Sequence, residues 1–187
     1  MNTAISAKSF IFRAKRRAFG TVLGFSLLAL AAGLFIHDWH ISWPLVFFYA
    51  LLLLNTYFSI RTFASITPEN NLLQHFIDMA LGLCLFILPF QFNLPLNFAL
   101  WMTLLFVLAA LKYILLIPIA GYSRLLFMKI RVDSLGVLLC LLALWGILLG
   151  YVYVSTVLWA IIFFLANIYV LWLKPHYGLN LHQESFV

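Results

Sequence analysis

The sequence predicts an all-α membrane protein in which six transmembrane helices form three parallel two-helix repeats, with both termini in the cytoplasm. Composition, apolar stretches of membrane-spanning length and a threefold residue pattern predict this fold. Of the 187 residues, 66% are hydrophobic and 9% are charged. Soluble domains contain about 45–50% apolar and about 25% charged residues, so this composition excludes a soluble globule.

The apolar stretches are long enough to cross the hydrocarbon core as helices, which takes about 17–25 residues. They cover residues 19–36, 42–60, 74–91, 97–118, 133–151 and 153–173. Transmembrane strands would show alternating polarity over segments of about ten residues, and the sequence has none. Helices then remain as the way to satisfy backbone hydrogen bonds in lipid.

Two of these stretches begin with signals typical of helix N-termini. Thr67-Pro68-Glu69 places a capping hydroxyl, a first-turn proline and an acid before the third stretch. Asp133 lies at the start of the fifth stretch, where a carboxylate complements the helix dipole. We therefore expect the fifth helix to begin close to Asp133.

A set of residues recurs three times along the chain. Leu-Gly pairs open the odd stretches, while tryptophans begin the even stretches and tyrosines lie near their ends. The members are Leu23-Gly24, Leu81-Gly82 and Leu135-Gly136; Trp43, Trp101 and Trp159; and Tyr57, Tyr113 and Tyr169. This spacing predicts repeated helix pairs at 13–61, 68–122 and 125–175. We expect the glycines at close helix contacts and the tryptophans at the outer membrane interface.

The basic residues predict the orientation of the bundle. All 11 Lys and Arg residues fall on one side of the predicted helices: Lys8, Arg13, Lys15, Arg16, Arg17, Arg61, Lys112, Arg124, Lys129, Arg131 and Lys174. The opposite connections, near 37–41, 92–96 and 151–152, carry none. Cytoplasmic loops are enriched in Lys and Arg, so both termini are expected in the cytoplasm. The net charge of +6 then reflects topology and attraction to anionic lipid, and nucleic acid is not an expected partner.

We divide the chain into a cytoplasmic arm of residues 1–12, a six-helix transmembrane domain of residues 13–175 and a cytoplasmic tail of residues 176–187. A cleavable signal is the alternative for the N-terminus, because a basic segment, an apolar stretch and Ala29-Leu30-Ala31 resemble one. Cleavage there would destroy the first of the three repeats and leave the second helix unpaired. We therefore expect the N-terminal segment to be retained.

A candidate polar cluster lies inside the predicted helices, at similar depth near the cytoplasmic face: Asn55, Asp78, Lys112 and Asn167. Intramembrane polar groups are costly and indicate functional sites by default. One interpretation is a cytoplasm-facing cavity in which Asp78 pairs with Lys112 and which binds a headgroup, a small anion or a proton. The other is structural: the asparagines bond between helices, for about 0.6–2 kcal/mol each, and Lys112 extends to the interface.

A weaker candidate site is His37-Asp38-Trp39-His40 in the first outer connection. Its two imidazoles, His37 and His40, could respond to external pH, with Asp38 between them. A structural zinc site needs four ligands, and that side holds no other His or Cys, so we predict no metal. Cys84 and Cys140 are expected to behave as buried hydrophobes.

Enzyme signatures are not evident in the sequence. The patterns G-x-S-x-G, H-E-x-x-H, C-x-x-C and the phosphate-binding P-loop are absent. The 5 acidic residues leave little for acid–base chemistry. We therefore expect a protein that is not an enzyme and carries no cofactor.

The basic start Lys15-Arg16-Arg17-Ala18 and the Leu-Gly pairs resemble the HdeD-like family of small bacterial inner-membrane proteins. The chain's size and the polar inner loop before each later helix pair are also similar. The resemblance covers nearly the whole chain and rests on no catalytic motif. It implies a multi-pass protein of the bacterial inner membrane, associated with stress and, in some members, with acid resistance.

Two main functional hypotheses follow, and a membrane-embedded enzyme is a third. The first is a non-enzymatic inner-membrane protein that acts through contacts with membrane lipids, other membrane proteins or a second copy of itself. The alternative is a small solute carrier or a substrate-binding membrane component, with the polar cluster as its site.

Overall fold

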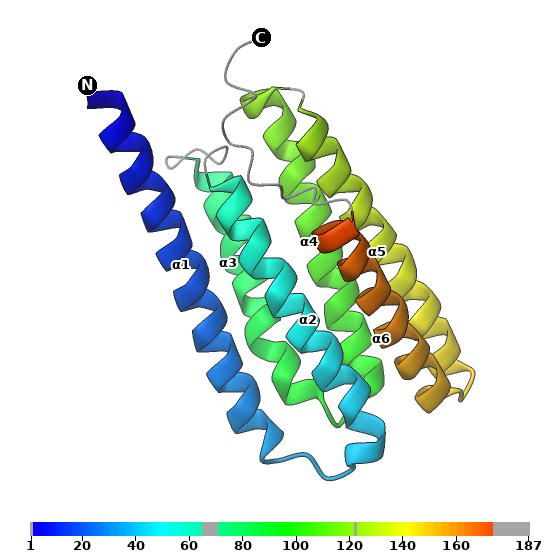
Figure 1. Cartoon of the computed structure of the whole chain (residues 1–187). Helices are drawn as coiled ribbons and strands as arrows, with labels where there is room; N and C mark the ends of the chain where they lie inside the picture. Colours follow the sequence, from blue (N-terminus) through cyan, green and yellow to red (C-terminus); the bar gives the residue numbers. More distant parts are fainter. Residues whose placement is uncertain (1, 65–70, 122, 174–187) are drawn as a thin grey trace.

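The computed structural model describes residues 2–64, 71–121 and 123–173, and the regular structure in these ranges is helical (Figure 1). A 3₁₀ turn, η1 (Leu88–Gln91), follows the third helix, and a π-helical turn, η2 (Tyr169–Leu173), follows the sixth. The six helices are α1 (Asn2–Gly33), α2 (Trp39–Phe63), α3 (Leu72–Ile87), α4 (Pro95–Ala120), α5 (Arg124–Leu148) and α6 (Val152–Ile168). The predicted all-helical fold is confirmed for the described part of the chain.

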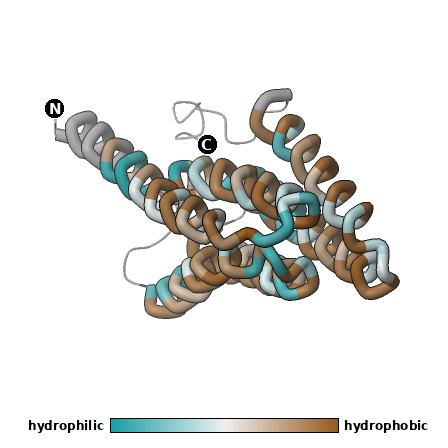
Figure 2. Tube along the Cα trace, turned by 90° about the horizontal axis from the view of Figure 1, so that it is seen from below, coloured by the Kyte–Doolittle hydropathy of each residue, from teal (hydrophilic) through white to brown (hydrophobic). Residues whose placement is uncertain are grey.

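Five of the described helical segments are long and apolar enough to cross a membrane: Trp39–Phe63, Leu72–Gln91, Pro95–Ile119, Arg124–Leu148 and Val152–Leu171. Hydrophobic residues occupy most positions along the helices (Figure 2). The chain is therefore an integral membrane protein. The first helix is not among these five, since Arg13, Lys15, Arg16 and Arg17 lie within it. Its role as a sixth span stays a prediction.

Consecutive helices run antiparallel and form one bundle (Figure 1). The most extensive packing joins α4 to α5 and α1 to α2, while α2 also packs on α6, which is distant in sequence. We call the end where α2 ends and α5 begins the basic end, because it carries Arg61, Arg124 and Arg131. The loops after α1, η1 and α5 lie at the opposite end.

An aromatic core fills the half of the bundle away from the basic end. The Phe48 ring of α2 stacks on Phe163 at 4.1 Å and lies 4.4 Å from Trp159, both in α6. Phe98 of α4 meets the Phe48 ring edge-on at 6.2 Å. Such pairs add about 0.5–1.5 kcal/mol each beyond their buried area.

Trp159 belongs to this core, and its side chain is only 1% exposed. The prediction that it lies at the outer interface is therefore wrong. The reason is the start of α6 at Val152, which puts Trp159 about two turns inside the helix. Trp43, in contrast, lies in the second turn of α2 and is exposed.

The repeat glycines do not share one packing role. A Cβ added to Gly136 of α5 would lie 2.6 Å from the Phe106 ring of α4, so this glycine permits a close helix contact. A Cβ at Gly24 or Gly82 would meet nothing within 4 Å. The expected close contact is present at one of the three positions, and the other two have open space beside them.

Tyr49 connects α2 to the end of α3. Pro89 has no backbone N–H, so it ends the regular hydrogen bonding of α3 and leaves the Leu85 carbonyl without its helical donor. The buried Tyr49 hydroxyl donates to that carbonyl oxygen at 2.8 Å. The carbonyl that proline leaves without a donor in α3 thus receives a hydrogen bond from α2.

The helix starts differ from the sequence prediction. Asn71 caps α3 by accepting a hydrogen bond from Gln74 N at 3.2 Å, and the predicted signal at Thr67-Pro68-Glu69 lies outside the described residues. Ser123 caps α5 by accepting from Leu126 N at 3.1 Å. Helix α5 therefore begins at Arg124, and the prediction that it begins close to Asp133 is wrong.

Candidate functional site

A cavity of about 750 Å³ lies between α1, α2, α3, α4 and α5, in the half of the bundle toward the basic end. Small-molecule pockets have volumes of about 300–1,000 Å³, so this cavity is large enough for a ligand. Its lining is polar toward the basic end: Arg13, Arg17, Thr21, Asn55, Thr56, Ser59, His75, Asp78, Lys112, Tyr113, Lys129 and Asp133.

Helical periodicity places the lining residues of α1, and likewise those of α3, on one face of their helix. On α1, the lining residues Arg13, Arg17, Thr21 and Phe25 recur every four positions, so they share one helix face. On α3, the lining residues recur every three or four positions from His75 to Leu85. Helices α1 and α3 make few contacts with each other, so they act as two walls of the cavity.

Lys112 of α4 and Asp78 of α3 form an ion pair on the cavity wall. Lys112 Nζ donates to Asp78 Oδ1 at 2.5 Å, and the two side chains are 14% and 45% exposed. The Gln74 side-chain amide holds the same region by donating to the Lys112 backbone carbonyl at 3.3 Å. Pairs exposed to this extent stabilise a fold by about 0–1 kcal/mol, so geometry and charge are the main consequences of this pair.

Lys129 and Asp133 form a second ion pair, within α5. Lys129 Nζ lies 2.6 Å from Asp133 Oδ1, and the side chains are 8% and 1% exposed. Asp133 Oδ2 is buried and has no hydrogen-bond partner among the described residues. A buried carboxylate oxygen in that state carries a desolvation cost that a donor from a ligand would relieve.

Sequence reasoning missed this pair because it placed Asp133 at a helix start. The signal was present: Lys129 and Asp133 are four residues apart, which places them on one face of a helix that already includes both. Ser123 before Arg124 is a typical N-cap and indicates the earlier start.

Tyr113 lies between the two lysines. Their Nζ atoms are 5.8 Å (Lys112) and 5.5 Å (Lys129) from the centre of the Tyr113 ring. Its hydroxyl is 2.7 Å from Ser59 Oγ of α2. Cations within about 6 Å of an aromatic ring are attracted to it, so this tyrosine helps to hold both ammonium groups at the cavity.

The candidate polar cluster is divided by the structure. Asn55, Asp78 and Lys112 line the cavity together. Asn167 is buried in α6, where its Nδ2 donates to the Phe163 carbonyl oxygen at 2.8 Å, and it is not among the lining residues. Its hydrogen bond lies within its own helix.

Arg13 and Arg17 are cavity residues that sequence reasoning assigned only to topology. Both are exposed, and neither makes an ion pair within the described part of the chain. The cavity lining therefore has four Lys and Arg side chains and two carboxylates, and each carboxylate is paired with a lysine. The positive charge of the two arginines is left to attract an anion.

The weaker candidate site at the opposite end has structural uses. Asp38 caps α2 by accepting hydrogen bonds from His40 N at 2.9 Å and Ile41 N at 3.4 Å. The His40 ring stacks on Tyr153 with centroids 4.2 Å apart. His37 N donates to Asn93 Oδ1 at 3.0 Å, which joins two loops. Within the described ranges, no three His, Cys, Asp or Glu side chains are grouped to hold a metal.

Comparisons with models of known protein families, with curated proteins and with solved structures give no match to this chain. The HdeD-like resemblance therefore stays a prediction. Evidence about function comes from the membrane-spanning bundle and from the charged cavity within it.

Proposed function

We propose that the chain is a non-enzymatic, multi-pass protein of the bacterial cytoplasmic membrane that binds an anionic group in the cavity at its basic end. The observation that carries this proposal is the charge of the lining. Lys112 and Lys129 neutralise the two carboxylates, while Arg13 and Arg17 have no acidic partner among the described residues. Guanidinium groups match the geometry of phosphate and carboxylate, which favours an oxyanion as the ligand.

The proposed orientation puts the basic end in the cytoplasm and uses α1 as the sixth span. The described Lys and Arg residues at that end support this orientation, because cytoplasmic loops carry such an excess. The apolar half of α1 packs along α2, which supports membrane insertion of both. In this arrangement the cavity faces the cytoplasmic leaflet and its headgroups.

Binding is better supported than catalysis by the groups on the wall. The Ser59 hydroxyl is within hydrogen-bond distance of the Tyr113 hydroxyl, and one oxygen of each carboxylate accepts from a lysine. A nucleophile needs an adjacent general base, and that base must lie within hydrogen-bond distance of the proton that it removes. The described lining groups instead hold one another in place around a positive cavity.

A small solute carrier is the second candidate. The unpartnered Asp133 Oδ2 on the cavity wall favours it, since a buried carboxylate oxygen suits a coupled proton or cation. Transport would also require a path through the other half of the bundle. The aromatic core around Phe48 and Trp159 fills that half, so a carrier would have to separate α2 from α6.

A titration with hexyl phosphate tests the proposed binding. The protein is held in an uncharged detergent, and hexanol serves as the uncharged analogue. The double variant Arg13→Gln/Arg17→Gln removes both unpaired cavity charges. The double variant Lys15→Gln/Arg16→Gln removes the same charge from exposed positions of α1 that do not line the cavity.

We expect hexyl phosphate to bind and hexanol to bind more weakly. The cavity double variant should lose affinity by about tenfold or more, as expected for one or two charge-assisted hydrogen bonds of about 1.5–3 kcal/mol each. The control double variant should lose much less. Equal losses in the two variants, or no binding of hexyl phosphate, would overturn the proposed function.

A further inference from the structure

The cavity changes from polar to apolar along its length. On α1 its lining runs from Arg13 and Arg17, through Thr21, to Phe25. The twelve steps from Arg13 to Phe25 extend about 18 Å along the helix at about 1.5 Å per residue. A small free anion needs only the basic end of such a cavity, and the deeper part would be left empty.

The other helices show the same gradient. On α3 the lining runs from His75 and Asp78 to Leu85. On α4, which runs in the opposite direction, Lys112 is at the basic end and Phe106 lies deeper. The three helices therefore agree on which end is charged and which is apolar. This is the pattern that an amphiphile with one charged end requires.

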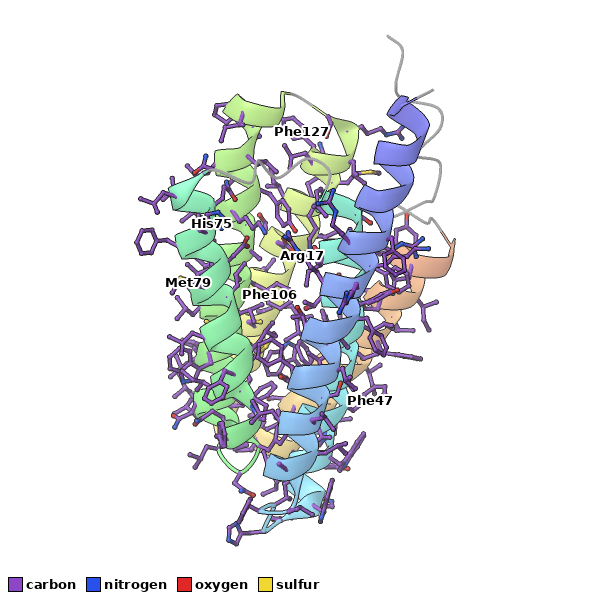
Figure 3. The ribbon with its side chains drawn as sticks, turned by 90° about the vertical axis from the view of Figure 1, so that its left-hand side faces the viewer. Arg17, Phe47, His75, Met79, Phe106 and Phe127 are labelled. Atoms are coloured by element: carbon purple, nitrogen blue, oxygen red, sulfur yellow. The ribbon has the colours of Figure 1, made fainter. Side chains whose placement is uncertain are left out.

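Helices α1 and α3 form two adjacent sides of the cavity. These helices line the same cavity but make few contacts, and α1 packs mainly on α2. Seen from that side, Phe106 of α4 lies between the ribbons of α3 and α1 (Figure 3). Gly82, on the α3 wall, has no atom within 4 Å of an added Cβ, so open space lies beside this residue.

From these observations we propose that the ligand is an anionic membrane lipid, which enters between α1 and α3 from the cytoplasmic leaflet. This inference rests on the proposed function. The phosphate of the lipid lies at Arg13, Arg17 and Lys112, and an acyl chain lies along Phe25, Leu85 and Phe106. Anionic lipids are concentrated in that leaflet, and the basic side chains are at the headgroup level of the proposed orientation.

The test measures separately how the headgroup charge and the acyl chain of the ligand contribute to binding. Native mass spectrometry in uncharged detergent measures binding of phosphatidylglycerol, with phosphatidylcholine as the zwitterionic control. Inorganic phosphate is added separately as a competitor of hexyl phosphate. Gly82→Leu fills the apolar part of the cavity, and Gly24→Leu adds the same side chain at a repeat glycine outside it. Ala109→Leu, from α4, fills the cavity from another wall.

We expect phosphatidylglycerol to bind about tenfold more tightly than phosphatidylcholine, which corresponds to about 1.4 kcal/mol. Gly82→Leu and Ala109→Leu should each weaken phosphatidylglycerol binding by a similar factor, and Gly24→Leu should not. Thermal melting of each variant identifies any that fails to fold, and the remaining cavity-filling variant then decides the outcome.

Two results overturn the inference, and they differ in what they say about the proposed function. In the first result, inorganic phosphate displaces hexyl phosphate and the cavity-filling variants bind phosphatidylglycerol normally. The ligand is then a free anion, and the proposed function stands. If hexyl phosphate fails to bind, the proposed function fails together with the inference.

Discussion

Lys112 on α4 reaches Asp78 on α3 with 2.5 Å between Nζ and Oδ1, while Lys129 and Asp133 make a second pair within α5. The pairs have similar lengths and different surroundings. Asp78 is 45% exposed and Asp133 is 1% exposed. Burial decides how much each pair matters for stability, because an unpaired charge is costly only where water cannot reach it.

Removal of the carboxylate charge should therefore have unequal effects. Asp133→Asn leaves the buried Lys129 ammonium without the negative charge of Asp133 and should cost about 3–5 kcal/mol. Asp78→Asn should cost at most about 1 kcal/mol, since its pair is partly solvated. Urea unfolding in mixed micelles measures both. The double variant Lys129→Met/Asp133→Leu should recover most of the loss. Equal losses from the two single variants would contradict the burial of the α5 pair.

Gly136 and Gly82 each follow a leucine in the recurring sequence pattern but should respond in opposite ways to alanine. Gly136→Ala forces its Cβ against the Phe106 ring, and overpacking of this kind costs about 1–3 kcal/mol. Gly82→Ala meets no atom and should stabilise the helix by up to about 1 kcal/mol. Melting temperatures in detergent give the comparison. Phe106→Leu should rescue Gly136→Ala, and a shift of the same sign for both glycines would disagree with this packing.

Tyr49→Phe should destabilise the protein by about 1–3 kcal/mol, because it leaves the buried Leu85 carbonyl without a donor. The loss depends on Pro89, which removes the helical donor. In a Pro89→Ala background, a backbone N–H is available at position 89 and the same substitution should cost less. A double-mutant cycle by chemical unfolding measures this coupling. Additive effects would show that the two residues act separately.

The proposed orientation predicts which engineered cysteines react from outside the cell. Tyr151→Cys, in the loop after α5, should be labelled by an impermeant maleimide in intact cells. Arg124→Cys, at the start of α5, should be labelled only after permeabilisation. Both positions are exposed, whereas the native Cys84 and Cys140 are buried and give a quiet background. The reverse labelling pattern would put the basic end outside.

Apolar length and residue depth were enough to predict much of this architecture. The spans after the first follow from long apolar stretches, and Asn55, Asp78 and Lys112 were assigned to one depth by counting along the helices. Packing between particular side chains could not be predicted in this way. Gly136 differs from Gly82 because Phe106 faces only one of them, and Trp159 is buried because α2 and α6 meet there.

The sequence analysis assigned Arg13 and Arg17 to membrane topology, and it assigned Asp78 and Lys112 to a polar cluster. The structure places all four in the lining of one cavity. Cytoplasmic segments are enriched in Lys and Arg, and this rule alone explained Arg13 and Arg17, so the sequence did not indicate a binding role for them. Asp133 was read as a helix start because the apolar stretch begins beside it, although Ser123 caps the helix earlier. Asn167 was assigned to the same depth as the other polar residues, but it belongs to α6, and the cavity is lined by residues of α1 to α5.

The most direct test of the central claim is an experimental structure of the protein in nanodiscs that contain phosphatidylglycerol. A bound lipid should give phosphate density within hydrogen-bond distance of Arg17 and Lys112, with chain density continuing toward Phe106. A structure in which protein side chains fill the cavity, or in which phosphate density is confined to the outer surface of the bundle, would contradict it.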